Sequence, residues 1–322
     1  MNLTTQLNNG FTLFMSLLVE AIPFLLLGVL LSSALLLFVD EKKLITTLPK
    51  NPFLGALFGS CAGFLFPVCE CGNVPVARRL LLQGAPAPVA VGFLLAAPTI
   101  NPVVIWSTWV AFREQPEIVW LRVVFSLAIA TIIGLVFSAQ ADLRPLLQPS
   151  VYRDLNQGPA LLQSGSFLLG QPGEVKRLDP SLLSAPQGNP WHLFIDNTIQ
   201  ELRELGGVLV LGSAIAAFLQ VAVPRETIVT LGQGPVLSIV AMMVLAALVS
   251  ICSTVDAFFA LAFSSVFTSG SLLAFLVFGP MIDLKAIGLM LSIFRTKAIV
   301  YMFALAAQLV FVFALFMNFY IS

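Results

Sequence analysis

The residues from Gly63 to Pro102 form an apolar stretch that is interrupted repeatedly by helix breakers and ionisable groups. It contains two cysteines, a glutamate, two arginines and several prolines and glycines. Lipid cannot hydrogen-bond a freed backbone N–H or C=O, so broken backbone at membrane depth is tolerated only inside protein or beside a cavity. Ionisable groups at such a break mark a candidate functional site.

The whole chain is far more apolar than a soluble protein. It is 58% hydrophobic and only 10% charged, against roughly 25% charged in soluble domains. Several apolar runs reach the ~20 residues that cross a bilayer. We therefore expect an all-α, polytopic transmembrane protein with eight to ten membrane-crossing segments. The net charge is zero, which gives no basic surface for a nucleic acid.

Two similar halves flank a hydrophilic segment. Residues 1–139 and 191–322 carry the apolar runs, whereas 140–190 is rich in Gln, Ser, Gly and Pro and reads as a linker loop. Cys69 and Cys252 lie 183 residues apart, and the segments 98–101 and 280–283 lie 182 apart. This near-constant offset predicts two repeats, parallel or inverted. Interrupted apolar segments at matching positions of two repeats point to a transporter site near the bilayer midplane.

The helix breakers define where the apolar helices should be interrupted. We expect breaks at Pro67, Gly72, Pro75, Pro98, Pro102, Gly279 and Pro280. After the first cysteine pair, Asn73 is a good N-cap for a helix that restarts near Val74. After Cys252, the sequence from Ser253 to Asp256 is typical of another helix start. In both halves a cysteine would precede the positive end of a helix, which favours a thiolate or a bound anion.

Three cysteines are candidate ligands for a solute. Cys69, Cys71 and Cys252 would supply soft sulfur donors, which select thiophilic species such as Cu(I), zinc and, by the same chemistry, trivalent arsenic. They are also our candidate metal ligands. Cys69 and Cys71 can serve one ligand only if the backbone between them is extended or turned. The alternative is that these residues are small buried core side chains, which is the interpretation we favour for Cys61.

Polar and acidic residues at the breaks complete the candidate site. Glu70 and Asp256 are candidates for ion coupling, because a carboxylate inside a membrane is costly and usually functional. Asn101 and Asp283 occupy matching breaks and could bind substrate. The alternatives are that Asp256 caps a helix and that Asp283 pairs with Lys285.

Two arginines follow the first break. Arg78 and Arg79 could balance Glu70, bind an anion or extend to the membrane interface, and we favour the first or the last. No Walker A, GxSxG or HExxH pattern is present, so the sequence does not indicate an enzyme. We expect no cofactor.

Four segments resemble a known family. Residues 67–79, 93–102, 252–258 and 274–285 are similar to a family of bacterial predicted permeases with two repeats. That family includes ArsP-type efflux permeases for trivalent organoarsenicals and relatives suspected of exporting metals. The resemblance covers nearly the whole chain except the central loop. It implies an exporter of small soft solutes in the cytoplasmic membrane, driven by an ion gradient.

The sequence thus predicts a permease that exports a trivalent organoarsenical or a soft metal ion by alternating access between the halves, coupled to protons. Its partners would be the solute and the lipid bilayer, and its oligomeric state and orientation stay open. One alternative is a carrier of a small organic anion. A second is a membrane enzyme with Cys69 and Cys71 as a redox pair. A third is a scaffold whose partner contacts lie on residues 140–190.

Overall fold

The part of the chain that the structure describes is almost entirely α-helical. The computed structural model describes residues 3–38, 48–49, 51–66, 69–138, 147–149, 151, 190–222 and 234–320. Their elements are α1 (Leu3–Phe38), α3 (Pro52–Ala62), the 3₁₀-helix η1 (Gly63–Leu65), α4 (Glu70–Leu82), α5 (Ala87–Ile100), α6 (Pro102–Ala111), α7 (Pro116–Ser138), α9 (Pro190–Ala222), α11 (Pro235–Val249), α12 (Asp256–Leu261), α13 (Ser269–Met281), α14 (Leu284–Met290) and α15 (Thr296–Tyr320). The all-α prediction is confirmed. Pro67 and nearly all of the predicted linker lie outside the described residues.

Among the described residues, six segments are long and apolar enough to cross a membrane. They are Leu7–Leu37, Ala87–Ala111, Pro116–Ser138, Phe194–Val221, Ser269–Met290 and Thr296–Phe319. Two shorter apolar helical segments, Pro52–Leu65 and Val236–Val249, fall below that length. A polytopic membrane protein is therefore confirmed, while the repeat relation between the halves stays a prediction.

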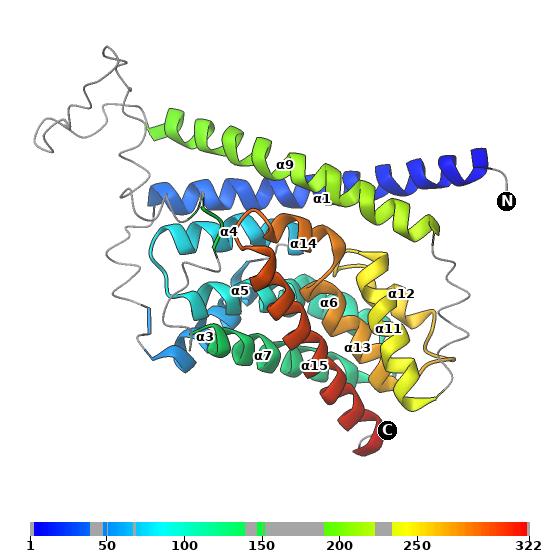
Figure 1. Ribbon diagram of the computed structural model, residues 1–322. Coiled ribbons are helices and arrows are strands. Elements are labelled where there is room, and N and C mark those ends of the chain that lie inside the picture. The colour runs from blue at the N-terminus through cyan, green and yellow to red at the C-terminus, as the bar shows by residue number, and fades with distance from the viewer. Residues whose placement is uncertain are drawn as a thin grey trace, which may run out of the picture.

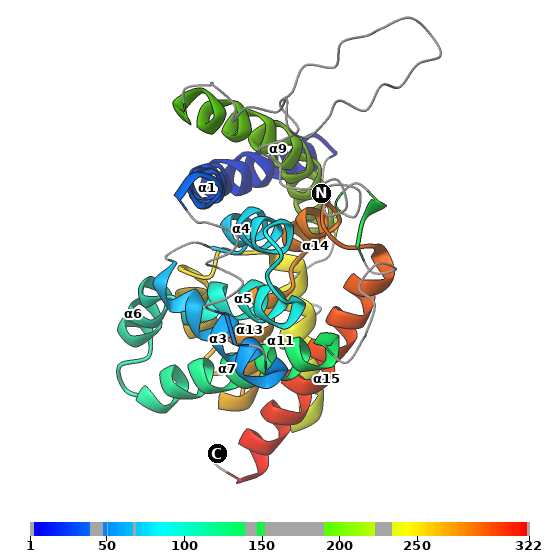
Figure 2. The same cartoon turned by 90° about the vertical axis from the view of Figure 1, so that its left-hand side faces the viewer.

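The helices are arranged in layers. Helices α1 and α9 lie side by side across one face of the molecule (Figure 1). Figure 2 shows α4 and α14 beneath this pair, and α5 and α13 in the middle of the molecule. Helices α3, α7, α11 and α15 surround that centre on the side away from α1 and α9.

The central helices are apolar on all sides, as helices enclosed by protein must be. Every residue of α5 is buried, and so is almost every residue of α13. Each is followed by a short break and a second helix, at Asn101 in one case and at Ile282 and Asp283 in the other. These two breaks interrupt membrane-spanning segments, so they place polar side chains inside an apolar bundle.

The predicted break positions were wrong for five residues. Gly72 and Pro75 lie inside α4, Pro98 lies inside α5, and Gly279 and Pro280 lie inside α13. A proline removes one intrahelical hydrogen bond, but neighbouring helices in a membrane protein can stabilise the interrupted helix. In contrast, Pro102 is the first residue of α6, where a missing N–H removes no intrahelical bond.

Gly72 has a packing role instead. A Cβ on Gly28 of α1 would lie 2.5 Å from the Cα of Gly72 and 2.8 Å from its carbonyl carbon. The backbones of α1 and α4 therefore touch near the start of α4. The expected N-cap was also misplaced, because Cys69 occupies the N-cap position of α4 and Asn73 lies within the helix.

Candidate solute-binding site

The interruption just before α4, at Cys69, brings two thiols and a carboxylate together, and we call it the first break. Cys69 has an extended backbone, with ψ −179°, and α4 begins at the next residue. The ligand atoms of Cys69, Glu70 and Cys71 lie within 4.8 Å of one another, and all three residues are buried. The extended N-cap residue thus allows Cys69 and Cys71, two residues apart, to face one point, which a continuous helix would prevent.

The third thiol comes from the second half of the chain. Cys252 lies between α11 and α12, with its thiol close to that of Cys69. The Thr254 hydroxyl donates to the Cys252 sulfur at 3.5 Å. We call Cys69, Cys71 and Cys252 the thiol cluster. Its members are 2%, 0% and 2% exposed, so the thiol cluster is closed to the outside in this conformation.

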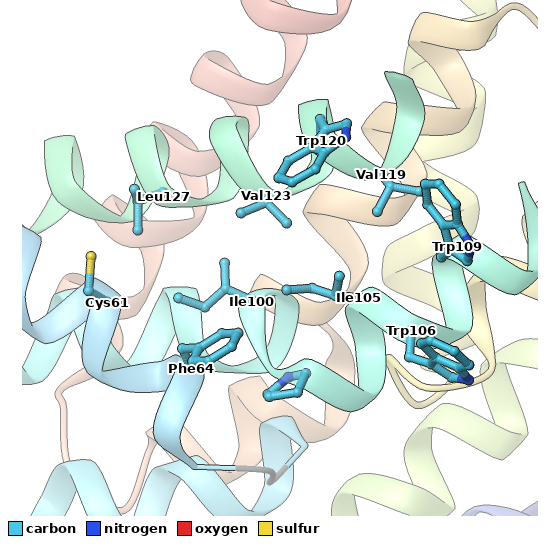
Figure 3. Close-up of a pocket in the computed structure, with 11 residues that line it drawn as sticks. Cys61, Phe64, Ile100, Ile105, Trp106, Trp109, Val119, Trp120, Val123 and Leu127 are labelled. Carbon is cyan, nitrogen blue, oxygen red and sulfur yellow. The ribbon is translucent and has the colours of Figure 1, made fainter. Parts of the chain in front are cut away.

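Cys61 lies elsewhere. It is exposed on α3 and lines an apolar cavity of about 740 Å³ between α3, α6 and α7. Figure 3 shows Trp106, Trp109 and Trp120 along the same cavity. The lining carries no charged group and a single thiol, that of Cys61, so this cavity lacks the several ligands that a metal ion or an anion needs.

A lysine of the second half faces the first break. Lys285 on α14 is 1% exposed, and its Nζ lies 3.8 Å from Oε1 of Glu70. Its neighbour Asp283 is the N-cap of α14 and accepts the Ala286 N–H at 2.5 Å. Among the described residues, Oε2 of Glu70 and Oδ2 of Asp283 have no hydrogen-bond partner. Two buried carboxylates therefore share one ammonium group.

Unpaired polar groups surround these charges. Asn73 is fully buried, and neither atom of its carboxamide finds a partner in the described parts of the chain. It lies one helical turn after Cys69 and Glu70, hence on the same face of α4. The Ser253 hydroxyl, beside Cys252, is also buried and unpaired there. Buried polar groups normally have partners, so these atoms favour a site that binds a ligand.

The interruption between α11 and α12, which we call the second break, carries a buried ion pair. Asp256, the first residue of α12, accepts two hydrogen bonds from the Arg122 guanidinium of α7, at 3.0 and 2.6 Å. The same guanidinium donates to the Thr108 hydroxyl at 2.7 Å. All of these side chains are buried. The alternative interpretation of Asp256 as a helix cap is wrong, because the N-cap of α12 is Val255.

The two arginines after the first break pair with α9. Arg79 is buried and forms an ion pair with Glu201, while Arg78 pairs with Glu204 at 2.8 Å. The Ser32 hydroxyl of α1 also donates to Glu201. The interpretation that they balance Glu70 was therefore wrong, whereas their extension to the membrane interface stays a prediction. These pairs bind α4 to the layer formed by α1 and α9.

Asn101 acts as a helix cap. Its Oδ1 accepts the backbone N–H groups of Val103 and Val104 at 2.8 and 3.0 Å. That oxygen therefore satisfies two backbone N–H groups in the first turn of α6. A role of Asn101 in binding a solute stays a prediction.

Sequence reasoning missed two partners, Lys285 for Glu70 and Arg122 for Asp256. A signal for both was present, since an ionisable residue inside an apolar, membrane-length segment is expected to be paired and functional. The sequence could not identify the partner, because in each case it lies more than 130 positions away.

Comparison with known proteins agrees with this architecture. Residues 6–319 match the family ArsP_1, described as predicted permease. The chain is 41% identical over 292 residues to the UPF0718 protein YcgR of Bacillus subtilis, covering 91% of this chain and 90% of that protein. It is 30% identical over 306 residues to a Streptococcus mutans protein named "Putative two-component membrane permease complex subunit", covering 94% and 93%. No solved structure matches the chain.

The match covers both halves and the central segment. Together with the six membrane-spanning segments, it supports a multi-pass bacterial membrane protein and a transporter rather than an enzyme. The chain belongs to the ArsP_1 family of predicted permeases.

Proposed function

We propose that this permease exports a small thiophilic solute, a trivalent organoarsenical or a soft metal ion, by alternating access at the thiol cluster. The observation that carries the proposal is the meeting of Cys69 and Cys71 from the first half with Cys252 from the second. Soft sulfur donors select soft species. A site built from both halves changes shape when the halves move relative to each other, as alternating access requires.

Export would be coupled to protons through a buried carboxylate. Glu70 and Asp256 are both buried, and each pairs with a cation from the other half of the chain. Movement of the halves would change these partners. A change of partner alters the free energy of the charged carboxylate relative to its protonated form. Movement of the halves would therefore couple uptake and release of a proton to transport of the solute.

The alternative carrier of an organic anion has less support. It needs a free cation at the breaks, but Arg78, Arg79, Arg122 and Lys285 each lie within ion-pair distance of a carboxylate. An anion would have to displace a buried carboxylate to reach one of them. The alternative redox enzyme would require Cys69 and Cys71 to cycle between thiols and a disulfide.

The test is transport into everted membrane vesicles. Methylarsenite, Zn²⁺ and Cd²⁺ would be supplied with and without a proton gradient, using Cys69→Ser, Cys71→Ser and Cys252→Ser, with Cys61→Ser as the matched control. We expect each of the three variants to lower transport roughly tenfold or more, since a lost sulfur contact worth ~1.4 kcal/mol has that effect. Cys61→Ser should transport normally, and a protonophore should abolish accumulation.

Unchanged transport in all three cysteine variants, at normal expression, would contradict the thiol role. Transport of a small organic anion by those variants would then favour the anion carrier. A Cys69–Cys71 disulfide that forms and disappears during turnover, seen by mass spectrometry, would favour the redox enzyme.

A further inference from the structure

The donor atoms at the first break are not all sulfur. The Glu70 carboxylate lies with the Cys69 and Cys71 thiols, all three ligand atoms being within 4.8 Å of one another. Zinc-like divalent ions bind both Cys sulfur and Glu oxygen, whereas Cu(I) prefers sulfur alone. A trivalent arsenical bound by two thiols needs no carboxylate. A buried oxygen ligand beside two thiols therefore favours a divalent soft cation.

The lysine that faces this carboxylate is held loosely. Charge-assisted N–H···O bonds measure about 2.7–2.9 Å, but Nζ of Lys285 stands 3.8 Å from Oε1 of Glu70. The other oxygen, Oε2, has no hydrogen-bond partner among the described residues. A buried ion pair of this kind offsets little of its desolvation cost. The ammonium group thus balances the charge of Glu70 without occupying its lone pairs.

From these observations, and resting on the proposed function, we propose that the solute is a divalent soft cation bound by Cys69, Cys71 and Glu70. Lys285 is then the resident counter-ion that this cation displaces from Glu70. In the empty protein the ammonium group holds the place of the cation. The solute and the lysine compete for one carboxylate, so loading and release of the solute both involve movement of the Lys285 side chain.

The lysine has a second partner to which it can turn. Lys285 interacts electrostatically with Asp283, and Oδ2 of Asp283 has no hydrogen bond in the described residues. The backbone of Lys285 is packed beneath α9, because a Cβ on Gly212 would lie 3.5 Å from the Lys285 Cα. Only the flexible side chain is therefore free to move, and it keeps a carboxylate partner after it leaves Glu70.

The charge of the cluster balances through this exchange. Binding breaks two S–H bonds, at Cys69 and Cys71, forms two metal–sulfur bonds and releases two protons. One divalent cation enters as two protons leave, so the buried cluster keeps its net charge. Lys285 stays protonated throughout, and no oxidation occurs. A neutral trivalent arsenical that exchanges its hydroxyl groups for two thiols gains nothing from displacing an ammonium group.

The test is a Cd²⁺ titration of the full-length protein in detergent, followed by the cadmium–thiolate charge-transfer absorption. We expect Lys285→Met to bind Cd²⁺ roughly tenfold tighter, a gain of ~1.4 kcal/mol, because the competitor is removed. Lys297→Met, which removes an exposed lysine of α15, is the matched control and should bind as the wild type does. Phenylarsine oxide, a neutral dithiol reagent, should bind both lysine variants and the wild type equally.

A double-mutant cycle separates displacement from a general gain in negative charge. Glu70→Gln should weaken Cd²⁺ binding, and Lys285→Met should give no gain when added to Glu70→Gln, because the contested carboxylate is gone. A tenfold gain that persists in the double variant would overturn the displacement. Should Lys285→Met fail to fold, Lys285→Gln makes the same test with a polar side chain.

The outcomes distinguish the inference from the proposed function. Unchanged or weaker Cd²⁺ binding by Lys285→Met, together with cysteine-dependent binding of phenylarsine oxide, would overturn the inference and leave the thiol site standing. If Cys69 and Cys71 were needed for the binding of neither Cd²⁺ nor phenylarsine oxide, the inference and the proposed function would both be overturned.

Discussion

The two breaks place a cysteine before a helix in different ways. At the first break, Cys69 is itself the N-cap of α4, a helix of 13 residues. At the second, Cys252 stands four positions before α12, a helix of only 6 residues. The acids differ even more. Asp256 is held by two hydrogen bonds from Arg122, at 3.0 and 2.6 Å. Within the described parts of the chain, Glu70 has one cation, at 3.8 Å, and an oxygen without a hydrogen bond.

This difference indicates a division of roles. A buried pair with two short hydrogen bonds is a structural connection, here between α7 of the first half and α12 of the second. A loose pair with orphaned oxygens leaves ligand positions open. In both breaks the cation belongs to the other half of the chain, so movement between the halves must alter both pairs. The first break is thus suited to binding, and the second to joining the halves.

The largest expected effect is the loss of the Arg122–Asp256 pair. Arg122→Met or Asp256→Asn leaves one buried charge uncompensated, which costs about 3–5 kcal/mol of stability. Thermal unfolding in detergent would show a large drop in the midpoint for either variant. The double variant Arg122→Met/Asp256→Leu should regain most of the loss, since apolar replacement of a whole buried pair is often neutral. A midpoint that is unaffected by Asp256→Asn would contradict the structural role of the second break.

A smaller effect is expected where α1 touches the first break. Gly28→Ala would place a Cβ against the Gly72 backbone, and overpacking of this kind costs about 1–3 kcal/mol. The matched control is Gly207→Ala on α9, where no heavy atom lies within 4 Å of the added Cβ. That variant should be neutral or up to ~1 kcal/mol more stable, because alanine favours a helix. Equal destabilisation of both variants would show that the contact of α1 with α4 does not matter.

Glu70→Gln tests the comparison directly. Because Lys285 keeps Asp283 within electrostatic range, the loss should be about 1–2 kcal/mol, within the ordinary range for point mutations and smaller than that of Asp256→Asn. Unfolding midpoints of the two variants under one condition provide the measurement. If Glu70→Gln were the more damaging change, the assignment of binding to the first break and joining to the second would be reversed.

The smallest effect belongs to Arg78. Its partner Glu204 has 45% of its side chain exposed, and pairs of this type contribute less than about 1 kcal/mol. Arg78→Ala should therefore shift the unfolding midpoint far less than Arg79→Ala, because Arg79 pairs with Glu201 in a buried position. Similar shifts for the two variants would mean that burial does not distinguish these neighbouring pairs.

Helix boundaries show where sequence reasoning failed. The sequence predicts helix breaks at Pro75, Pro98 and Pro280, yet each of these prolines lies inside a helix. A proline acts locally by removing one N–H, but whether the helix continues depends on the neighbours packed around it, which local sequence does not reveal. Pro102 and the caps Asn101 and Asp283 mark real helix starts, because an N-cap satisfies the backbone of its own helix.

The sequence alone determined the class of the protein and its candidate ligands. Apolar runs of membrane length require helices, since lipid leaves no other way to satisfy the backbone, and paired cysteines near ionisable residues mark a site in any arrangement of those helices. Only the tertiary structure decided which charges meet. Lys285 faces Glu70, Arg122 holds Asp256, and Glu201 takes Arg79. Electrostatic pairing acts across a few ångströms of space, and in a helical bundle that distance bears no relation to separation along the chain.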